Sequence, residues 1–310
     1  MQDDADPPAA LPDPARPVLI AGPTASGKSA LALRLARAQG RTVVNADAMQ
    51  VHADWRVLTA RPPRADEAAA PHRLYGHVPW GAAHSAGHWL REVAPLLAAR
   101  PAPVIVGGTG LFFAALTDGL AEIPPVPDDI RRDARDRLAE KGLAALAGEL
   151  DAATAGRLDL RNTARVLRAW EVEAATGRPL ADWQDATPPP LVPPEAAERI
   201  LLDAPKAWLT PRIALRMDAM LAGGAIEEAR ALLPHWDEAV ADGLPATRAI
   251  GAAEIVSCLR GATTLGAARD AAVVATRRYA KRQRTWFRAR MGGWRTIPAE
   301  RAADVVFGRR

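Results

Sequence analysis

The segment "GPTASGKS" (22–29) follows a short apolar run and precedes a stretch with helical spacing. It satisfies the pattern G-x-x-x-x-G-K-[ST], in which backbone N–H groups turn inward around phosphate, a lysine adds positive charge and a hydroxyl binds Mg²⁺. The N-terminus of the following helix adds the positive end of its dipole. The segment therefore predicts a phosphate-binding loop, with Ser29 as the metal ligand, made of Gly22, Pro23, Thr24, Ala25, Ser26, Gly27, Lys28 and Ser29.

The chain around this loop alternates strands with helices. Helical spacing is found at 28–40, which ends at Gly40, and at 85–100, where Ser85 is a candidate N-cap. Buried strands are indicated by three apolar runs, "RPVLIAG" (16–22), "RTVVNAD" (41–47) and "APVIVGG" (102–108). This order predicts an α/β fold with a P-loop NTPase-like parallel sheet flanked by helices. In such sheets the ligand binds outside the carboxyl ends of the strands.

Beyond "PPVP" (124–127) the pattern becomes mainly helical. Helices are predicted at 128–151, capped by Asp128 or Asp129, and at 161–177. The chain then returns to the sheet with a strand at 198–205. A helix follows at 210–233, with Thr210 as N-cap and Pro211 at the first helical position, and the remainder is helical through about residue 290. We expect a disordered tail at 1–16, a helical insertion at 128–180, and an α/β core made of 17–127 and 181–310.

Composition narrows the class of protein. Of 310 residues, 49% are hydrophobic and 25% are charged, which suits a soluble domain with a real core. The single cysteine, Cys258, excludes an internal disulfide and is compatible with a reducing cytoplasm. The start lacks the basic and apolar regions of a secretory signal. No window approaches the roughly 18 apolar residues of a membrane span, so we expect a cytoplasmic protein.

Positive charge is concentrated near the end of the chain. "RRYAKRQRTWFRAR" (277–290) contains many Arg and Lys residues and no acid, whereas residues 1–16 are acidic. This asymmetry indicates a surface that binds a polyanion. A solvated helix face is the alternative for a basic run taken alone.

The acid expected of an ATPase or GTPase is missing from the third strand. "VIVGG" (104–108) ends in glycine and is followed by Thr109, whereas such enzymes hold Mg²⁺ with an acid at a second strand end. The nearest carboxylate at a strand end is Asp47. As a metal ligand, Asp47 indicates a nucleotide kinase. As a general base, it indicates a transferase whose loop holds a pyrophosphate leaving group.

An ordered set of further segments separates these alternatives. After the loop come "NADAMQV" (45–51), "PHRL" (71–74), "VGGTGLF" (106–112), "RVLRAWEV" (165–172), "PRIALRMDAML" (211–221), "RAIGAAE" (248–254) and "TRRYAKRQRTWFR" (276–288). Together they resemble the tRNA dimethylallyltransferases over about residues 17–295. That family transfers a dimethylallyl group from dimethylallyl pyrophosphate to the N6 amine of the adenine adjacent to the anticodon, with Mg²⁺. Its tRNAs read codons that begin with U.

The resemblance implies roles for the residues of the phosphate end. The loop would hold the pyrophosphate of an isoprenoid, with Lys28, Thr109 and Arg216 stabilising the leaving group and Ser29 binding it through Mg²⁺. Arg212, one helical turn before Arg216, shares its face and would help to bind the pyrophosphate. Asp47 would accept a proton from the adenine amine, with a helix cap or a metal ligand as its alternative roles.

The resemblance also implies a tRNA anticodon stem-loop as partner, bound by a monomer. Gln50 would read adenine through a bidentate amide contact. Arg168 has an alternative role in an ion pair with Glu171, and Trp286 with Phe287 is more typical of core than of a base-stacking platform. The implied tRNA-binding residues are Asp47, Ala48, Met49, Gln50, Thr109, Arg131, Ala164, Arg165, Val166, Leu167, Arg168, Arg248, Arg278, Lys281 and Arg282.

The sequence departs from the family pattern at Ala48, His52, Phe112, Ala252 and Ala253, which puts details of tRNA contact in question. Three other classes compete with the tRNA enzyme. A nucleotide kinase has no use for a basic RNA-binding face. An adenylate isopentenyltransferase does not need the helical insertion. An RNA-binding protein with a vestigial loop does not need Lys28 and Asp47, which are both present.

Overall fold

The computed structural model describes residues 11–308, so residues 1–10 of the expected disordered tail lie outside the described part of the chain. The chain divides into two compact units. The first combines Met1–Thr117 with Val192–Arg310, and the second is Asp118–Leu191. The second unit contains the helical insertion expected at 128–180 and is longer at both ends.

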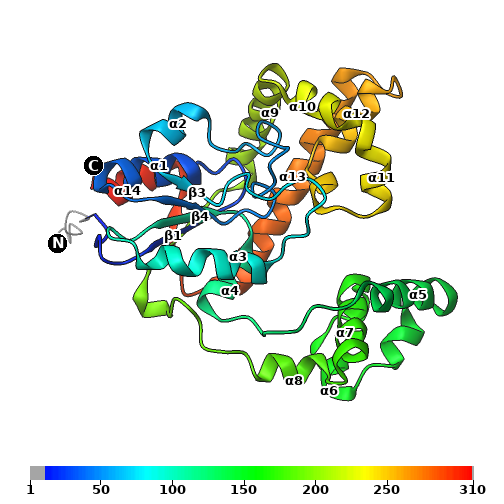
Figure 1. Cartoon of the computed structure of the whole chain (residues 1–310). Helices are drawn as coiled ribbons and strands as arrows, with labels where there is room; N and C mark the ends of the chain where they lie inside the picture. Colours follow the sequence, from blue (N-terminus) through cyan, green and yellow to red (C-terminus); the bar gives the residue numbers. More distant parts are fainter. Residues whose placement is uncertain (1–10, 309–310) are drawn as a thin grey trace. The chain divides into compact units, whose positions relative to one another are not determined.

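The first unit is built on one six-stranded parallel sheet (Figure 1). The strand order is β3-β2-β4-β1-β5-β6, and in the central β1 Ile20 is paired with Val106 on one side and Ile200 on the other. The sheet confirms the predicted α/β class. The strands are β1 (Val18–Ala21), β2 (Val43–Asn45), β3 (His72–Arg73), β4 (Val104–Gly107), β5 (Glu198–Asp203) and β6 (Arg295–Pro298).

Helices account for most of the remaining described residues. The second unit contains α5 (Asp128–Gly148), α6 (Ala152–Arg157), α7 (Thr163–Thr176) and α8 (Leu180–Asp185). The α-helices of the first unit are α1 (Lys28–Gln39), α2 (Arg64–Ala69), α3 (Ala86–Val93), α4 (Gly110–Thr117), α9 (Lys206–Ala222), α10 (Ala225–Leu232), α11 (Trp236–Ala241), α12 (Ala252–Leu259), α13 (Leu265–Arg290) and α14 (Ala302–Phe307). Its short 3₁₀ helices are η1 (Ala94–Ala98), η2 (Pro194–Ala196), η3 (Leu233–His235), η4 (Pro245–Arg248) and η5 (Ala299–Arg301).

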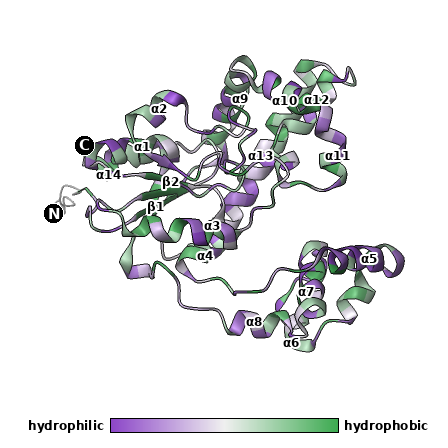
Figure 2. Ribbon diagram, in the orientation of Figure 1, coloured by the Kyte–Doolittle hydropathy of each residue, from purple (hydrophilic) through white to green (hydrophobic). Residues whose placement is uncertain are grey.

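The apolar strands and the apolar faces of the helices pack into separate hydrophobic clusters. The strands β1, β2 and β4 are buried along their whole length, and Figure 2 shows β1 and β2 as largely hydrophobic. Leu31 and Leu35 of α1 cover this sheet together with Val306 of α14. A second cluster joins α9–α13 around the fully buried Trp55. Among residues 11–308, no helix combines the length and the apolar character needed to cross a membrane.

The expectation of a disordered tail is wrong for residues 11–16. The buried Arg41 guanidinium donates to the backbone oxygens of Asp13 at 2.7 Å, Arg16 at 2.7 Å and Ala102 at 2.9 Å. A buried guanidinium requires such acceptors, because its donors cannot reach water. Composition did not reveal this anchor, since Arg41 lies far from the tail in sequence.

Several helix boundaries differ from the prediction. The helix expected at 210–233 begins earlier, as α9, and its N-cap is Pro205. Thr210 is therefore inside α9 and donates to the Lys206 carbonyl instead of capping, and Pro211 is also internal. The N-cap of α5 is Pro127, so Asp128 and Asp129 lie in the first turn, where their charges favour the helix dipole.

Other boundaries agree with the prediction. Ser85 caps α3 by accepting a hydrogen bond from the His88 N–H at 3.3 Å. Gly40 ends α1 and Gly177 ends α7, each in the left-handed conformation. The helix expected at 85–100 is shorter, because α3 ends at Val93 and the chain continues as η1.

Candidate active site

The phosphate loop lies between β1 and α1, as the sequence predicts. Ala25 and Gly27 have positive φ angles of 64° and 90°, which turn the chain back toward the start of α1. Lys28 is only 8% exposed and its Nζ donates to the Pro23 carbonyl at 3.3 Å. Burial lowers the pKa of Lys28 to about 8; nearby Asp47 opposes this shift and Arg216 adds to it. The Lys28 side chain is thus buried and hydrogen-bonded to its own loop.

The interior of the loop is tightly packed. A Cβ on Gly22 would lie 2.8 Å from Ser26 Oγ, so glycine is needed at that position. The buried Ser26 Oγ has no hydrogen-bond partner among the described residues. A buried unpaired hydroxyl is costly, and it is available to a ligand in the loop. Ser29, in the first turn of α1, is exposed.

Two arginines of α9 contact the loop. Arg216 Nη1 donates to Thr24 Oγ1 at 3.3 Å, and Arg212 Nε donates to the Ala25 carbonyl at 3.0 Å. Burial lowers the pKa of Arg216, and the attraction of Asp47 opposes the shift. Arg212 is exposed and its guanidinium lies 4.9 Å from the Trp208 ring centroid. The tertiary structure therefore places both arginines at the loop, one on its buried side and one on its outer side.

Asp47 follows β2 and is held by its own segment. The Asn45 side chain accepts from the Asp47 N–H at 2.9 Å and donates to the Asp47 carbonyl at 2.9 Å. Asp47 Oδ1 accepts from the Met49 N–H at 3.0 Å. The Asn45 carbonyl in turn accepts from Trp89 Nε1 of α3 at 2.6 Å. These contacts orient the carboxylate before any substrate arrives.

Thr109 joins the loops that follow β2 and β4. Its Oγ1 accepts from the Ala48 N–H at 2.9 Å, and its own N–H donates to the Ala46 carbonyl at 3.2 Å. A Cβ on Gly107 would lie 1.9 Å from that same carbonyl oxygen, so the two loops approach as closely as glycine allows. Asp47 and Thr109 are thereby brought to one edge of the sheet.

Sequence reasoning did not assign roles to Tyr279 and Gln283 of α13. Gln283 bridges the loops after β1 and β4, because its side chain accepts from the Thr24 N–H at 2.8 Å and donates to the Gly108 carbonyl at 2.9 Å. Burial raises the pKa of the Tyr279 hydroxyl, and Asp47 raises it further. Both residues belong to the segment 276–288, whose basic side chains indicate a polyanion-binding surface and whose neutral side chains carry no separate signal in the sequence.

Several of the residues described above surround one cavity of about 350 Å³. Its polar part is formed by Lys28, Asp47, Thr109 and Arg216, and Arg248 and Arg282 also line it. The apolar part of the lining consists of Leu58, Ile213, Met217, Met220 and Ile250. The outer side of the loop borders a second hollow, which Ser29 and Arg212 line.

The remaining predicted residues of the first unit are not all gathered at this cavity. Arg278 and Lys281 line a different hollow, between α9 and α13. Phe287 is buried in the core, as expected, whereas Trp286 is half-buried and occupies the space that a Cβ on Gly110 would need. Of the three predicted residues Arg278, Lys281 and Arg282, therefore, Arg282 is the one that lines the cavity.

The expected bidentate contact of Gln50 is not available in this structure. Its Nε2 donates to the Thr59 carbonyl at 3.0 Å and the Ala60 carbonyl at 3.2 Å, which uses both amide hydrogens. Only Oε1 remains to accept from a ligand. Ala48, Met49 and Gln50 nevertheless line the cavity next to Asp47.

The second unit holds the other predicted tRNA-binding residues. Ala164 and Arg165 are exposed at the start of α7, and Arg131 is exposed on α5. Val166 is fully buried in the core of this unit, so its side chain is not accessible to tRNA, whereas Leu167 is half-buried at the edge of that core.

Arg168 forms the ion pair with Glu171 that the sequence analysis gave as its alternative role. Its Nη1 lies 4.0 Å from Glu171 Oε2, and burial lowers the pKa of Arg168 against the attraction of Glu171. The contact leaves the guanidinium half-exposed.

Three of the positions that depart from the family pattern, Phe112, Ala252 and His52, have structural roles. The Phe112 ring stacks on Trp89 with centroids 4.7 Å apart, and Ala252 is buried in the helical core. His52 is 2% exposed, and burial lowers its pKa to about 4, with smaller contributions from His84 and His77. These side chains are parts of the packing.

Comparison with known proteins agrees with this geometry. The model of the IPP transferase family matches residues 50–290, and that of the isopentenyl transferase family matches residues 16–77. A tRNA dimethylallyltransferase of Dinoroseobacter shibae is 62% identical over 286 residues, which cover 91% of this chain and 95% of that protein. One of a Ruegeria species is 54% identical over 282 residues, covering 91% and 95%.

Solved structures show the same fold. The crystal structure of a tRNA isopentenylpyrophosphate transferase from Bacillus halodurans is 28% identical, covers 92% of this chain and 90% of its own, and has a TM-score of 0.63. A eukaryotic dimethylallyltransferase structure, at 23% identity, covers 92% of this chain and 74% of its own with a TM-score of 0.75. The chain therefore belongs to the IPP transferase family, the family of the tRNA dimethylallyltransferases.

Proposed function

We propose that the protein transfers a dimethylallyl group from dimethylallyl pyrophosphate to the exocyclic N6 amine of the adenine adjacent to the anticodon. The observation that carries the proposal is the cavity in which buried Lys28 and half-buried Arg216 lie beside Asp47, with an apolar wall that includes Ile213 and Met217. A cationic end suits a pyrophosphate, and an apolar wall suits a short isoprenoid chain. ATP, by contrast, has no branched apolar tail for such a wall.

The reaction breaks the allylic C–O bond and forms a C–N bond. The bonding pair of the C–O bond leaves with pyrophosphate, so negative charge grows on the leaving group. The loop N–H groups, Lys28 and Arg216 stabilise that charge, and Thr109 holds the segment that carries Asp47 beside it, through the Ala48 N–H. The adenine amine supplies the new bonding pair and loses one proton, which Asp47 accepts.

The residues present fit a Mg²⁺ ion. Ser29 offers an exposed hydroxyl at the start of α1. Hard oxygen ligands together with substrate phosphates are what Mg²⁺ prefers. When bound, the ion would neutralise charge on the pyrophosphate. The chain's own groups would still position the donor and accept the proton.

The tRNA stem-loop would be bound through phosphate contacts and one extruded base. In the first unit, Arg248 and Arg282 line the cavity and are exposed, so they can reach both the base and its phosphates. In the second unit, Arg131 and Arg165 are exposed. We propose a monomer acting in the cytoplasm on tRNAs that read codons beginning with U.

A transfer assay tests this function. Radiolabelled dimethylallyl pyrophosphate is supplied with an unmodified anticodon stem-loop carrying the target adenine, the same stem-loop with guanine there, or AMP. We expect label in the adenine stem-loop alone. Equal labelling of AMP would contradict the tRNA substrate. Consumption of ATP without labelling of any acceptor would identify the loop as a nucleotide site.

A further inference from the structure

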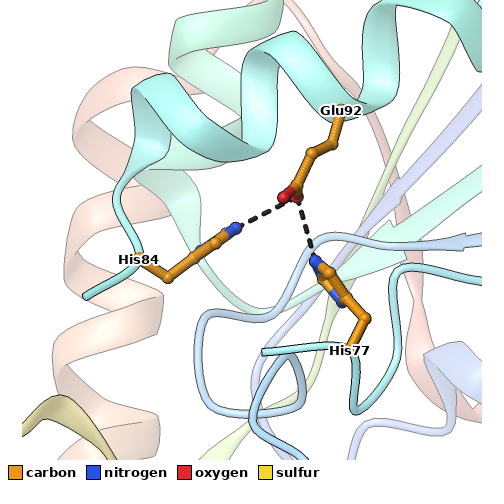
Figure 3. Close-up of side chains that lie close together, drawn as sticks. All are labelled: His77, His84 and Glu92. Atoms are coloured by element: carbon orange, nitrogen blue, oxygen red, sulfur yellow. Dashed lines mark hydrogen bonds and ion pairs between the residues drawn. The ribbon is translucent and has the colours of Figure 1, made fainter. Parts of the chain in front are cut away.

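Three side chains outside the cavity converge on one point (Figure 3). His77 lies in the loop after β3, His84 lies just before α3, and Glu92 lies on α3. His77 Nε2 and His84 Nε2 are each 3.0 Å from Glu92 Oε2. Their possible ligand atoms all lie within 4.8 Å of one another. None of the three lines the cavity that holds Asp47.

The group has one buried wall and one open side. The His84 side chain is 5% exposed and lies between other rings, with its centroid 6.3 Å from Phe112 and 5.8 Å from His88. His77 and Glu92 are about one-third exposed. A bound ion would thus be fixed from the protein side and reached by water from the other.

The ionisation states suit metal ligation. Burial lowers the pKa of His84, although its hydrogen bond to Glu92 opposes the shift. Burial by itself raises the pKa of Glu92, but the hydrogen bonds from His84 and His77 outweigh it and keep the net pKa below its ordinary value. Both shifts favour the forms that bind metals, which are a neutral imidazole and a carboxylate.

The spacing is close to that of a tetrahedral metal site. At bond lengths of about 2.0–2.2 Å, tetrahedral Zn²⁺ ligands lie about 3.4 Å from one another. The two N···O distances of 3.0 Å need to open only slightly for an ion to enter. Each imidazole would then carry its proton on Nδ1 and present the Nε2 lone pair to the ion. Two imidazoles and one carboxylate suit Zn²⁺ better than Mg²⁺, which prefers oxygen.

We propose that His77, His84 and Glu92 bind one divalent transition-metal ion of the Zn²⁺ class, with water as the remaining ligand. The site is structural, and it does not rest on the proposed transfer reaction.

The ion would brace the segment that carries Asp47. On one side, the chain around His77 is bonded to that segment, because the Gly76 N–H donates to the Gln50 carbonyl and the Val78 N–H to the Val51 carbonyl, both at 2.9 Å. On the other side, α3 is bonded to it through Trp89 and the Asn45 carbonyl. A metal joining His77 to Glu92 would therefore cross-link both supports of residues 45–51.

Metal binding and thermal unfolding test the proposal. Full-length protein stripped with EDTA is titrated with Zn²⁺, with Co²⁺ as a spectroscopic probe and with Mg²⁺ as a hard-cation control. We expect one equivalent of Zn²⁺, a tetrahedral Co²⁺ absorption spectrum, and a rise of a few degrees in Tm that Mg²⁺ does not produce. No Zn²⁺ binding, or no Tm shift on binding, would overturn the structural site.

Variants locate the ion. His77→Ala removes a partly exposed side chain, and Glu92→Gln keeps the shape of its residue while removing the charge. Each should weaken Zn²⁺ affinity by at least about tenfold and remove the Zn²⁺-induced rise in Tm. His235→Ala, at an exposed histidine of η3, is the matched control and should bind Zn²⁺ as the parent does. Unchanged affinity in both His77→Ala and Glu92→Gln would refute the site.

Discussion

Gln283 holds the phosphate loop at Thr24, because its Oε1 accepts a hydrogen bond of 2.8 Å from the Thr24 N–H. The Nε2 of the same amide donates to the Gly108 carbonyl at 2.9 Å, and the side chain is 5% exposed. One neutral side chain of the basic helix α13 thus connects the ends of two strands. The helix that carries much of the positive charge is bonded directly to the loop that is expected to hold pyrophosphate.

Gln283→Leu should loosen this connection. It leaves the Thr24 N–H and the Gly108 carbonyl without partners, at a cost of about 1–3 kcal/mol for a buried polar group. We expect a lower free energy of unfolding and weaker pyrophosphate binding, measured by denaturant unfolding and by titration calorimetry. Arg288→Leu, at an exposed position of the same helix, is the control and should change neither quantity. Parent-like pyrophosphate affinity in Gln283→Leu would show that the loop does not need the bridge.

Asp47→Asn should abolish proton acceptance while preserving shape. If Asp47 is the general base, kcat for transfer should fall by about 10²- to 10⁴-fold, whereas pyrophosphate affinity should change little. Rapid single-turnover assays with the adenine stem-loop separate the two effects. A loss confined to Mg²⁺ or pyrophosphate binding would instead identify Asp47 as a metal ligand.

Arg216 and Arg212 should contribute unequally, because Arg216 is half-buried and lines the cavity, whereas Arg212 is exposed and does not line it. Arg216→Ala should lower kcat/KM by about 10²-fold or more, as for loss of a preorganised donor to a developing anion. Arg212→Ala, on the exposed side of the loop, should cost less than about tenfold by the same measure. Equal losses in the two variants would show that the outer side of the loop binds the leaving group as well.

Pyrophosphate affinity should depend on pH through Lys28, whose pKa burial lowers to about 8. The anion binds the protonated amine and raises its pKa. The contribution of Lys28 to pyrophosphate affinity is therefore fully present below the Lys28 pKa of the ligand-free protein. It falls as pH rises above about 8, by up to about tenfold per pH unit. Calorimetric titrations at about pH 7 and pH 9 measure this slope. Lys28→Met should show a shallower slope, since pyrophosphate's own titration is common to both proteins; equal slopes would contradict the role of Lys28.

Gly107→Ala should strongly destabilise the first unit. The new Cβ would lie 1.9 Å from the Ala46 carbonyl oxygen, a backbone atom that cannot move without displacing the segment before Asp47. We expect a loss of about 3 kcal/mol or more in the free energy of unfolding. Gly266→Ala is the control, because nothing lies within 4 Å of its Cβ position and it lies in α13. It should be neutral or stabilising by about 0.5–1 kcal/mol.

Local sequence patterns account well for the sheet and its loop. Strands buried on both faces must be apolar throughout, and the β-branched runs at 16–22 and 102–108 are recognisable for that reason. β3 and β6 could not be recognised in the same way. β3 has only two residues, and β6 has a single buried residue, so neither carries a periodic signal.

Local sequence patterns alone were enough to predict the loop "GPTASGKS", the parallel α/β class and Asp47 as the carboxylate at a strand end, because each follows from neighbouring residues and short periods. Three relations could be read only from the packed molecule: Arg216 rather than Arg212 lines the cavity, Gln50 donates to the backbone, and His77, His84 and Glu92 lie together. These relations join residues from separate elements. Their distances depend on how helices pack on the sheet, which no local pattern encodes.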